Sequence, residues 1–319
     1  MQSTPLYPLL LDPALHVKVW GGRRLETVLN KSLPTDEPYG ESWEMHDTAT
    51  VANGDLAGRS LGDLLPVYRA ALVGEGNDPA LGFPLLAKFL DATDWLSVQV
   101  HPNDAQAQQF EGEPRGKTEA WYILAGEPDS RLVIGVQPGT TREVMAQAIR
   151  DSSLERLLVY APVGVGDVLS IPAGTVHALG PGLLIYEIQQ SSDITYRLYD
   201  WGRMDLNGQP RTLHVDKGVA VSNLERLPEI KHTAGDRRDA VDIVTSPYFS
   251  TLLHALDEGE FTFDTHGRFH ILTAIDGGVT IAAGGHQVAL DMGRTALIPA
   301  ALGAYQLRGK GKVLRSFQP

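Results

Sequence analysis

Four polar side chains of the kinds that bind metals occur in three separate strand-like segments. Gln99 and His101 alternate with valines within residues 95–104, so both are expected on the same face of a strand. Glu119 begins an apolar run, and His177 ends a glycine-bounded one. Two imidazoles, one carboxylate and one amide oxygen form a sulfur-free set that suits Zn²⁺ or another divalent first-row ion. Such a set also leaves room for a water molecule or a substrate.

Composition limits the class of protein. The 319 residues are 43% hydrophobic, which is enough for a sizeable core and two domains. The absence of cysteine excludes disulfides and thiolate metal sites. A net charge of −12 argues against a nucleic-acid partner. The sequence has no apolar run long enough for a membrane span and no signal-peptide pattern, so we expect a cytoplasmic protein without a membrane partner. Nothing in it indicates an oligomeric state.

Short β-branched and aromatic runs, separated by Gly, Pro, Asn and Asp, dominate the chain and predict a barrel or sandwich. Helical periodicity occurs at residues 61–73, 141–160 and 216–222, with a break and cap expected at residues 151–153, and we interpret these segments as insertions on a β scaffold. The polar run 231–239 has no apolar face and is the predicted linker. We therefore place a domain boundary near residue 235, between domains 1–235 and 236–319.

A weak internal repeat supports this division. Residues 166–177 align with residues 293–304 through a shared glycine and a shared Ile-Pro-Ala sequence. In that alignment His177 corresponds to Ala304, and the second copy contains no Gln-x-His pair. The C-terminal copy is therefore expected to keep the fold and to lack the metal site.

These motifs resemble a known family. Residues 166–177 follow the second cupin motif, and the whole arrangement is similar to the short bacterial form of the type I mannose-6-phosphate isomerases. The resemblance implies a mainly β fold with a metal-bearing cupin jelly-roll barrel, helical insertions and a degenerate cupin-like C-terminal domain. The segments that carry it are Leu-Ser-Val-Gln-Val-His-Pro-Asn-Asp (96–104), Gly-Lys-Thr-Glu-Ala-Trp-Tyr (116–122), Ile-Pro-Ala-Gly-Thr-Val-His-Ala-Leu (171–179) and Glu-Ile-Gln-Gln-Ser-Ser-Asp-Ile-Thr-Tyr-Arg (187–197).

The resemblance also implies an activity. A zinc-dependent aldose–ketose isomerase would interconvert mannose 6-phosphate and fructose 6-phosphate by proton transfer through an enediolate, with a small sugar phosphate as its partner. A divalent cation would stabilise the charge that develops on the substrate oxygen. The resemblance places one zinc ion on Gln99, His101, Glu119 and His177.

Other family positions fall on Lys117, Asp193 and Arg197, which become the candidate catalytic residues. Lys117 alternates with Glu119, so its ammonium should reach the metal cavity, where a neighbouring cation should lower its pKa. Arg197 suits either a phosphate or the enediolate oxygens. Asp193 is a candidate for orienting Arg197, for handling a proton, or for a turn. Lys88 interrupts an apolar strand and is a further candidate for holding phosphate; the general base stays open.

Two alternatives use the same residues differently. A cupin dioxygenase would activate oxygen on iron or copper, although Gln99 stands where such proteins usually have histidine, and Lys117 would have no evident role. Anaerobic turnover would separate it from an isomerase. A non-catalytic sugar-binding cupin with a structural metal is the other alternative, and it predicts no effect of replacing Lys117 or Arg197.

Overall fold

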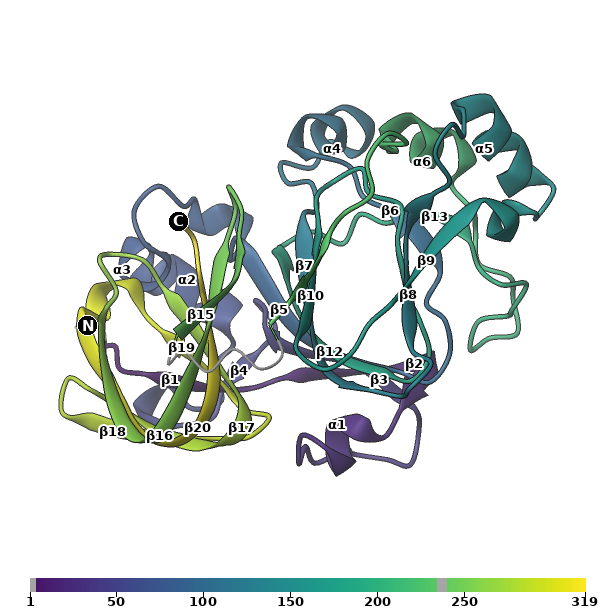
Figure 1. Ribbon diagram of the computed structural model, residues 1–319. Helices are drawn as coiled ribbons and strands as arrows, with labels where there is room; N and C mark the ends of the chain where they lie inside the picture. The colour runs from purple at the N-terminus through teal and green to yellow at the C-terminus, as the bar shows by residue number, and fades with distance from the viewer. Residues whose placement is uncertain (1–3, 234–239) are drawn as a thin grey trace.

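The structure, a computed structural model, describes residues 4–233 and 240–319. It is mainly β, as predicted, with short helices at one end of the larger body (Figure 1). The helices are α1 (Arg24–Thr27), α2 (Leu61–Tyr68), α3 (Ala70–Val73), α4 (Asp104–Glu111), α5 (Arg142–Arg150) and α6 (Val215–Val221), with 3-10 turns η1 (Gly54–Leu56), η2 (Pro79–Leu81), η3 (Leu154–Leu157) and η4 (Ala300–Leu302). The strands are β1 (Leu9–Asp12), β2 (Ala14–Gly22), β3 (Tyr39–Met45), β4 (Thr50–Val51), β5 (Leu85–Ala92), β6 (Val98–Val100), β7 (Glu119–Gly126), β8 (Arg131–Val136), β9 (Leu158–Pro162), β10 (Asp167–Ile171), β11 (Ala178–Leu179), β12 (Leu183–Gln190), β13 (Tyr196–Tyr199), β14 (Ile230–His232), β15 (Ala240–Thr245), β16 (Ser250–Asp264), β17 (His270–Ala283), β18 (His286–Asp291), β19 (Thr295–Ile298) and β20 (Ala304–Phe317).

The candidate ligands lie in the larger body. Its main sheet is antiparallel with the order β14-β10-β7-β12-β5-β3-β2. It curves toward two smaller sheets, β11-β8-β9 and β13-β6 (Figure 1). Every residue of β5 and β12 is buried, which is typical of strands covered on both faces. Among the described residues the main sheet ends at β14 and β2, so it is open and does not close into a single barrel.

The second body is an eight-stranded sheet that contains β15 to β20 together with β1 and β4. Leu9 of β1 pairs with Leu297 of β19, so the start of the chain is part of the C-terminal sheet. One hydrophobic core joins the bodies, with Phe89 and Tyr186 from the main sheet and Leu297 and Leu314 from the second. The predicted boundary at residue 235 lies outside the described residues.

The helical predictions hold in part. The predicted helix over residues 61–73 is split into α2 and α3 at Arg69, which has a φ of 48°. In the 141–160 segment the break expected at residues 151–153 is confirmed, because α5 ends at Arg150. The helical prediction is wrong after it, because residues 154–157 form only the 3-10 turn η3 and the apolar end pairs with β8 as β9. The prediction for residues 216–222 is confirmed by α6.

Helix α4 was not predicted. Its N-terminus is a capping box in which the Asn103 and Gln106 side chains each accept from the other's backbone N–H. Among the described residues, no helix has both the length and the apolar character needed to cross a membrane.

Candidate active site

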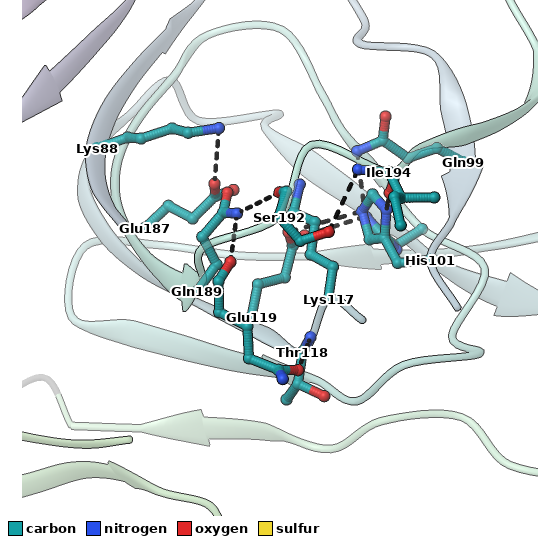
Figure 2. Close-up of polar contacts among 12 residues, drawn as sticks. Lys88, Gln99, His101, Lys117, Thr118, Glu119, Glu187, Gln189, Ser192 and Ile194 are labelled. Atoms are coloured by element: carbon teal, nitrogen blue, oxygen red, sulfur yellow. Dashed lines mark hydrogen bonds and ion pairs between the residues drawn. The ribbon is translucent and has the colours of Figure 1, made fainter. Parts of the chain in front are cut away.

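Three chain segments bring the predicted metal ligands together. Gln99 lies in β6, and His101 follows directly after it. His177 precedes β11 and exchanges two backbone hydrogen bonds with Gln99, of 2.9 and 3.0 Å. Glu119 is the first residue of β7 in the main sheet. The strand alternation in the sequence therefore places these side chains toward a common centre, as Figure 2 shows for Gln99, His101 and Glu119.

Glu119 is at the centre of the cluster. Its Oε1 lies 3.1 Å from His177 Nε2, and its Oε2 lies 3.6 Å from His101 Nε2. One ligand atom from each of these three residues lies within 4.8 Å of the others. Gln99 Nε2 is 3.3 Å from His177 Nε2, and rotating the amide by half a turn would put its oxygen in that place.

The donor set fits a divalent cation. His101 is 1% exposed, and Glu119 and His177 are fully buried. Among the described residues, His101 Nε2 has no hydrogen-bond partner, and the two Glu119 carboxylate oxygens accept no hydrogen bond of regular geometry although Lys117 and His177 lie beside them. A buried polar atom without a partner, such as His101 Nε2, costs about 1–3 kcal/mol. The other imidazole nitrogens are 2.8 Å from the Ile194 carbonyl and 2.9 Å from the Thr175 carbonyl, which leaves each Nε2 free to act as a ligand.

Charge also favours the metal-binding protonation states. Burial acts to raise the pKa of Glu119, but Lys117 and the two imidazoles lower it well below its usual range. Burial and the charge of Lys117 hold the pKa of His101 well below its ordinary value. Glu119 is therefore an anion and His101 a neutral base, as metal ligands must be.

Lys117 faces the same centre, with its ammonium 3.0 Å from Glu119 Oε2 and only 6% of the residue exposed. Burial acts to lower the pKa of Lys117, but the carboxylates of Glu119 and Glu187 raise it further, and the net shift is upward. The predicted fall in the pKa of Lys117 depends on a bound cation and stays a prediction, while the protein's own charges act in the opposite direction. Lys117 offers a fixed positive charge to the site.

A cavity of about 360 Å³ opens beside these residues, and Gln99, Lys117, Glu187 and Arg197 are among the side chains that line it. The cavity is bounded by the main sheet and by the segment around β13. Because metal ligands and charged side chains share one small space, the arrangement can hold and polarise a small oxygen-rich substrate.

Glu187 of β12 is a candidate functional residue that the sequence reasoning did not identify. Its Oε2 accepts a 2.7 Å hydrogen bond from Trp121 Nε1, while its buried Oε1 has no hydrogen-bond partner among the described residues. Burial and the nearby charge of Glu119 raise the pKa of Glu187. Glu187 is paired in register with Lys88, whose ammonium lies 3.5 Å from Oε1 (Figure 2). Opposite charges that interrupt two apolar strands were the available sequence signal.

The remaining predicted residues lie on the other wall. Arg197 of β13 lines the cavity and donates from one terminal nitrogen to the Thr212 carbonyl at 3.1 Å. Asp193 is exposed at the rim, in the loop before β13. Across the described part of the chain, Arg197 and Asp193 form no ion pair with each other.

Comparison with known proteins places the chain in a family. The phosphomannose isomerase type I catalytic domain matches residues 9–129, and the mannose-6-phosphate isomerase cupin domain matches residues 240–318, which confirms the predicted cupin class. Mannose-6-phosphate isomerase of Streptococcus mutans is 33% identical over 97% of this chain and 98% of its own length. Mannose-6-phosphate isomerase ManA of Bacillus subtilis is 34% identical over 97% of this chain and 98% of its own length. The crystal structure of the mannose 6-phosphate isomerase from Bacillus subtilis superposes with a TM-score of 0.87 and 30% identity, over 98% of this chain and 99% of that one. This chain belongs to the type I mannose-6-phosphate isomerase family.

Proposed function

We propose that this chain is a zinc-dependent isomerase that interconverts mannose 6-phosphate and fructose 6-phosphate. The observation that carries the proposal is the buried His101–Glu119–His177 cluster, whose ligand atoms lie within 4.8 Å of one another and adjoin a charged cavity. Near full-length relatives that carry this enzyme name support the choice over the dioxygenase and binding-only alternatives.

Gln99, His101, Glu119 and His177 would hold one zinc ion, since two imidazoles with oxygen donors form a set that zinc accepts. When bound, zinc supplies a Lewis acid that stabilises negative charge on a substrate oxygen. The hydrogen bonds from the outer imidazole nitrogens to the Ile194 and Thr175 carbonyls would keep both rings in place.

The chain's own groups handle the proton. Converting an aldose into a ketose moves a proton between adjacent carbons. This requires a general base that removes the proton from one carbon and then delivers it to the other. Glu187 suits this role because its pKa is raised and because its buried Oε1 accepts no hydrogen bond from a described residue, with only the Lys88 ammonium 3.5 Å away. The permanent charge of Lys117 would hold a substrate oxygen, and the guanidinium of Arg197 would contact the substrate from the opposite wall. Asp193, which is exposed at the rim, would contact the substrate as it enters the cavity.

The proposal also includes the division into domains and the cellular location. The division into a catalytic domain (1–235) and a cupin-like domain (236–319) is supported by the cupin match that starts at residue 240 and by the position of all candidate ligands before residue 235. Cytoplasmic localisation stays a prediction from the sequence.

The test combines metal analysis of the purified protein with assays on several aldose phosphates, before and after chelation. We expect about one zinc per chain, mannose 6-phosphate isomerase activity that is lost on chelation and restored by Zn²⁺, and equal turnover with and without oxygen. Activity that survives complete metal removal, or that requires oxygen, would refute the proposal.

A further inference from the structure

Cationic side chains reach the cavity from both walls, but they differ in how they are neutralised. The three lysines that line the cavity all lie near carboxylates. Lys18 Nζ lies 3.0 Å from Glu41 Oε1, and Lys117 Nζ lies 3.0 Å from Glu119 Oε2. Lys88 lies 3.5 Å from Glu187 and 3.9 Å from Glu41. This wall therefore offers little uncompensated charge to an anionic ligand.

The wall around β13 presents two guanidinium groups to the cavity and one carboxylate, that of Asp193, which is exposed at the rim. Arg197 and Arg211 both line the cavity. Within the described residues, Arg197 has no carboxylate at ion-pair distance, and its buried Nε has no acceptor. Arg211 shares its carboxylate, Asp200, with Arg203, which also lies 3.4 Å from Asp94.

Asp200 fixes the orientation of Arg211. The carboxylate of Asp200, which is 7% exposed, accepts from Arg211 Nε at 2.7 Å and from a terminal nitrogen of Arg211 at 2.5 Å. It also accepts from Arg203 Nε at 3.1 Å. A two-point contact of this kind holds a planar guanidinium in one orientation and leaves its remaining N–H donors free for another acceptor.

Arg197 and Arg211 lie on adjoining segments, because Arg197 donates to the carbonyl of Thr212, the residue after Arg211. Two guanidinium groups on one patch repel each other unless an anion lies between or beside them. A phosphate ester carries a charge of about −1.5 to −2 at neutral pH and accepts several hydrogen bonds, whereas the hydroxyls of a sugar carry no charge.

We infer that Arg211, held in place by Asp200, forms with Arg197 the wall that binds the phosphate group of the substrate, and that Asp200 is a positioning residue for this wall. The inference rests on the proposed function in one respect only, namely that the phosphate belongs to a sugar substrate. It places the reacting end of the sugar toward Lys117 and Glu187, and the phosphate toward β13.

The test measures binding of inorganic phosphate to the purified holoenzyme by calorimetry, alongside KM and kcat for mannose 6-phosphate. Arg211→Met should raise the phosphate Kd and the KM by about 10- to 100-fold, as expected for losing charge-assisted hydrogen bonds, with kcat changed less than about threefold. Asp200→Asn keeps every arginine and should raise both values by about 3- to 10-fold. Arg211→Lys keeps the charge without the planar fork and should fall between wild type and Arg211→Met.

Two control variants make the test specific. Arg203→Met removes the other guanidinium bound to Asp200, but Arg203 does not line the cavity, so the phosphate Kd should change less than about threefold. Lys18→Met removes a cavity cation that is already paired with Glu41, with the same small effect expected. Wild-type phosphate affinity in Arg211→Met, or a larger loss in Lys18→Met, would overturn the inference. If Arg211→Met does not fold, Asp200→Asn and Arg211→Lys decide the question by the same criteria.

The outcomes also separate this inference from the proposed function. If the wild type fails to isomerise mannose 6-phosphate while its phosphate binding still depends on Arg211, the function is wrong and the anion-binding wall stands. If the wild type is an active isomerase whose KM and phosphate affinity do not depend on Arg211, the function stands and the wall is wrong.

Discussion

Replacing Glu187 by glutamine should abolish most of the isomerase turnover and leave the fold intact. The amide has nearly the volume of the carboxyl, and its oxygen can still accept the 2.7 Å hydrogen bond from Trp121 Nε1. Lys88 would lose one partner but would keep Glu41 at 3.9 Å. What the substitution removes is the only proton-accepting state of this side chain.

The size of the effect follows from the role. A positioned general base contributes about 10²- to 10⁴-fold to a rate, which corresponds to about 3–5 kcal/mol of barrier. Because burial and Glu119 raise the pKa of Glu187, its carboxylate form should be lost on acidification at a pH above that of an ordinary glutamate. The wild-type pH profile should therefore show an acid limb that lies above the ordinary glutamate range and is absent from Glu187→Gln.

Glu41 provides a matched control on the same cavity. Burial acts to raise the pKa of Glu41, but Lys88 and Lys18 lower it to about 2, which makes it a poor proton acceptor at neutral pH. Glu41→Gln should therefore reduce kcat less than about 10-fold. The assay is kcat for mannose 6-phosphate across pH, together with the rate at which the substrate C2 hydrogen exchanges with solvent. A Glu187→Gln enzyme that keeps kcat within 10-fold of wild type and an unchanged acid limb would refute the reasoning.

Three further predictions concern the metal and stability. Glu119→Ala should bind less than about a tenth of the wild-type zinc and lose at least about 10³-fold in activity while its circular dichroism is unchanged; full zinc content would contradict the ligand assignment. Burial lowers the pKa of His254 to about 4 and that of His270 to about 3, so the unfolded chain takes up protons before the folded one as pH falls below about 6.5. Urea unfolding should therefore show a loss of about 2 kcal/mol from each of these two histidines between pH 7 and pH 5, and His270→Gln should reduce the total loss by about 2 kcal/mol; an unchanged pH slope in that variant would argue against this source. The ion pair of Lys31 and Glu44, at 2.7 Å and with side chains 6% and 1% exposed, lies against the second body, where Lys31 donates to the Gly293 carbonyl and Glu44 accepts from Thr295. Lys31→Met should therefore cost about 3–5 kcal/mol and Lys31→Met/Glu44→Leu markedly less, as measured by the same unfolding assay.

The ligand cluster could be predicted because it depends on local alternation. A period of two fixes the face on which Gln99, His101 and Glu119 lie, and the glycine-bounded segment before His177 ends beside Gln99. Strand alternation does not reveal which charged side chains from distant strands lie close together in the fold. The carboxylates that raise the pKa of Lys117 in the protein alone are Glu119, two positions away, and Glu187, which lies 70 positions away in β12 and could not be placed near Lys117 from the sequence pattern.

The parts of the fold that were missed also depend on long-range pairing. β9 begins within a stretch of helical periodicity, and its pairing with β8 prevails over that local preference. β1 joins the C-terminal sheet through contacts with residues almost 290 positions away, for which local patterning carries no signal. By contrast, the Asn103–Gln106 capping box of α4 is a local signal that could have been recognised from the spacing of the two residues.

The central claim is that side chains from three distant segments hold one dication. X-ray absorption at the zinc edge of the purified holoenzyme, compared between wild type and a His101→Ala variant, tests it most directly. The account predicts a wild-type shell of nitrogen and oxygen atoms at about 2.0–2.2 Å that includes two imidazoles, and one imidazole fewer in the variant. A wild-type shell without two imidazoles, or one that is the same in His101→Ala, would contradict it.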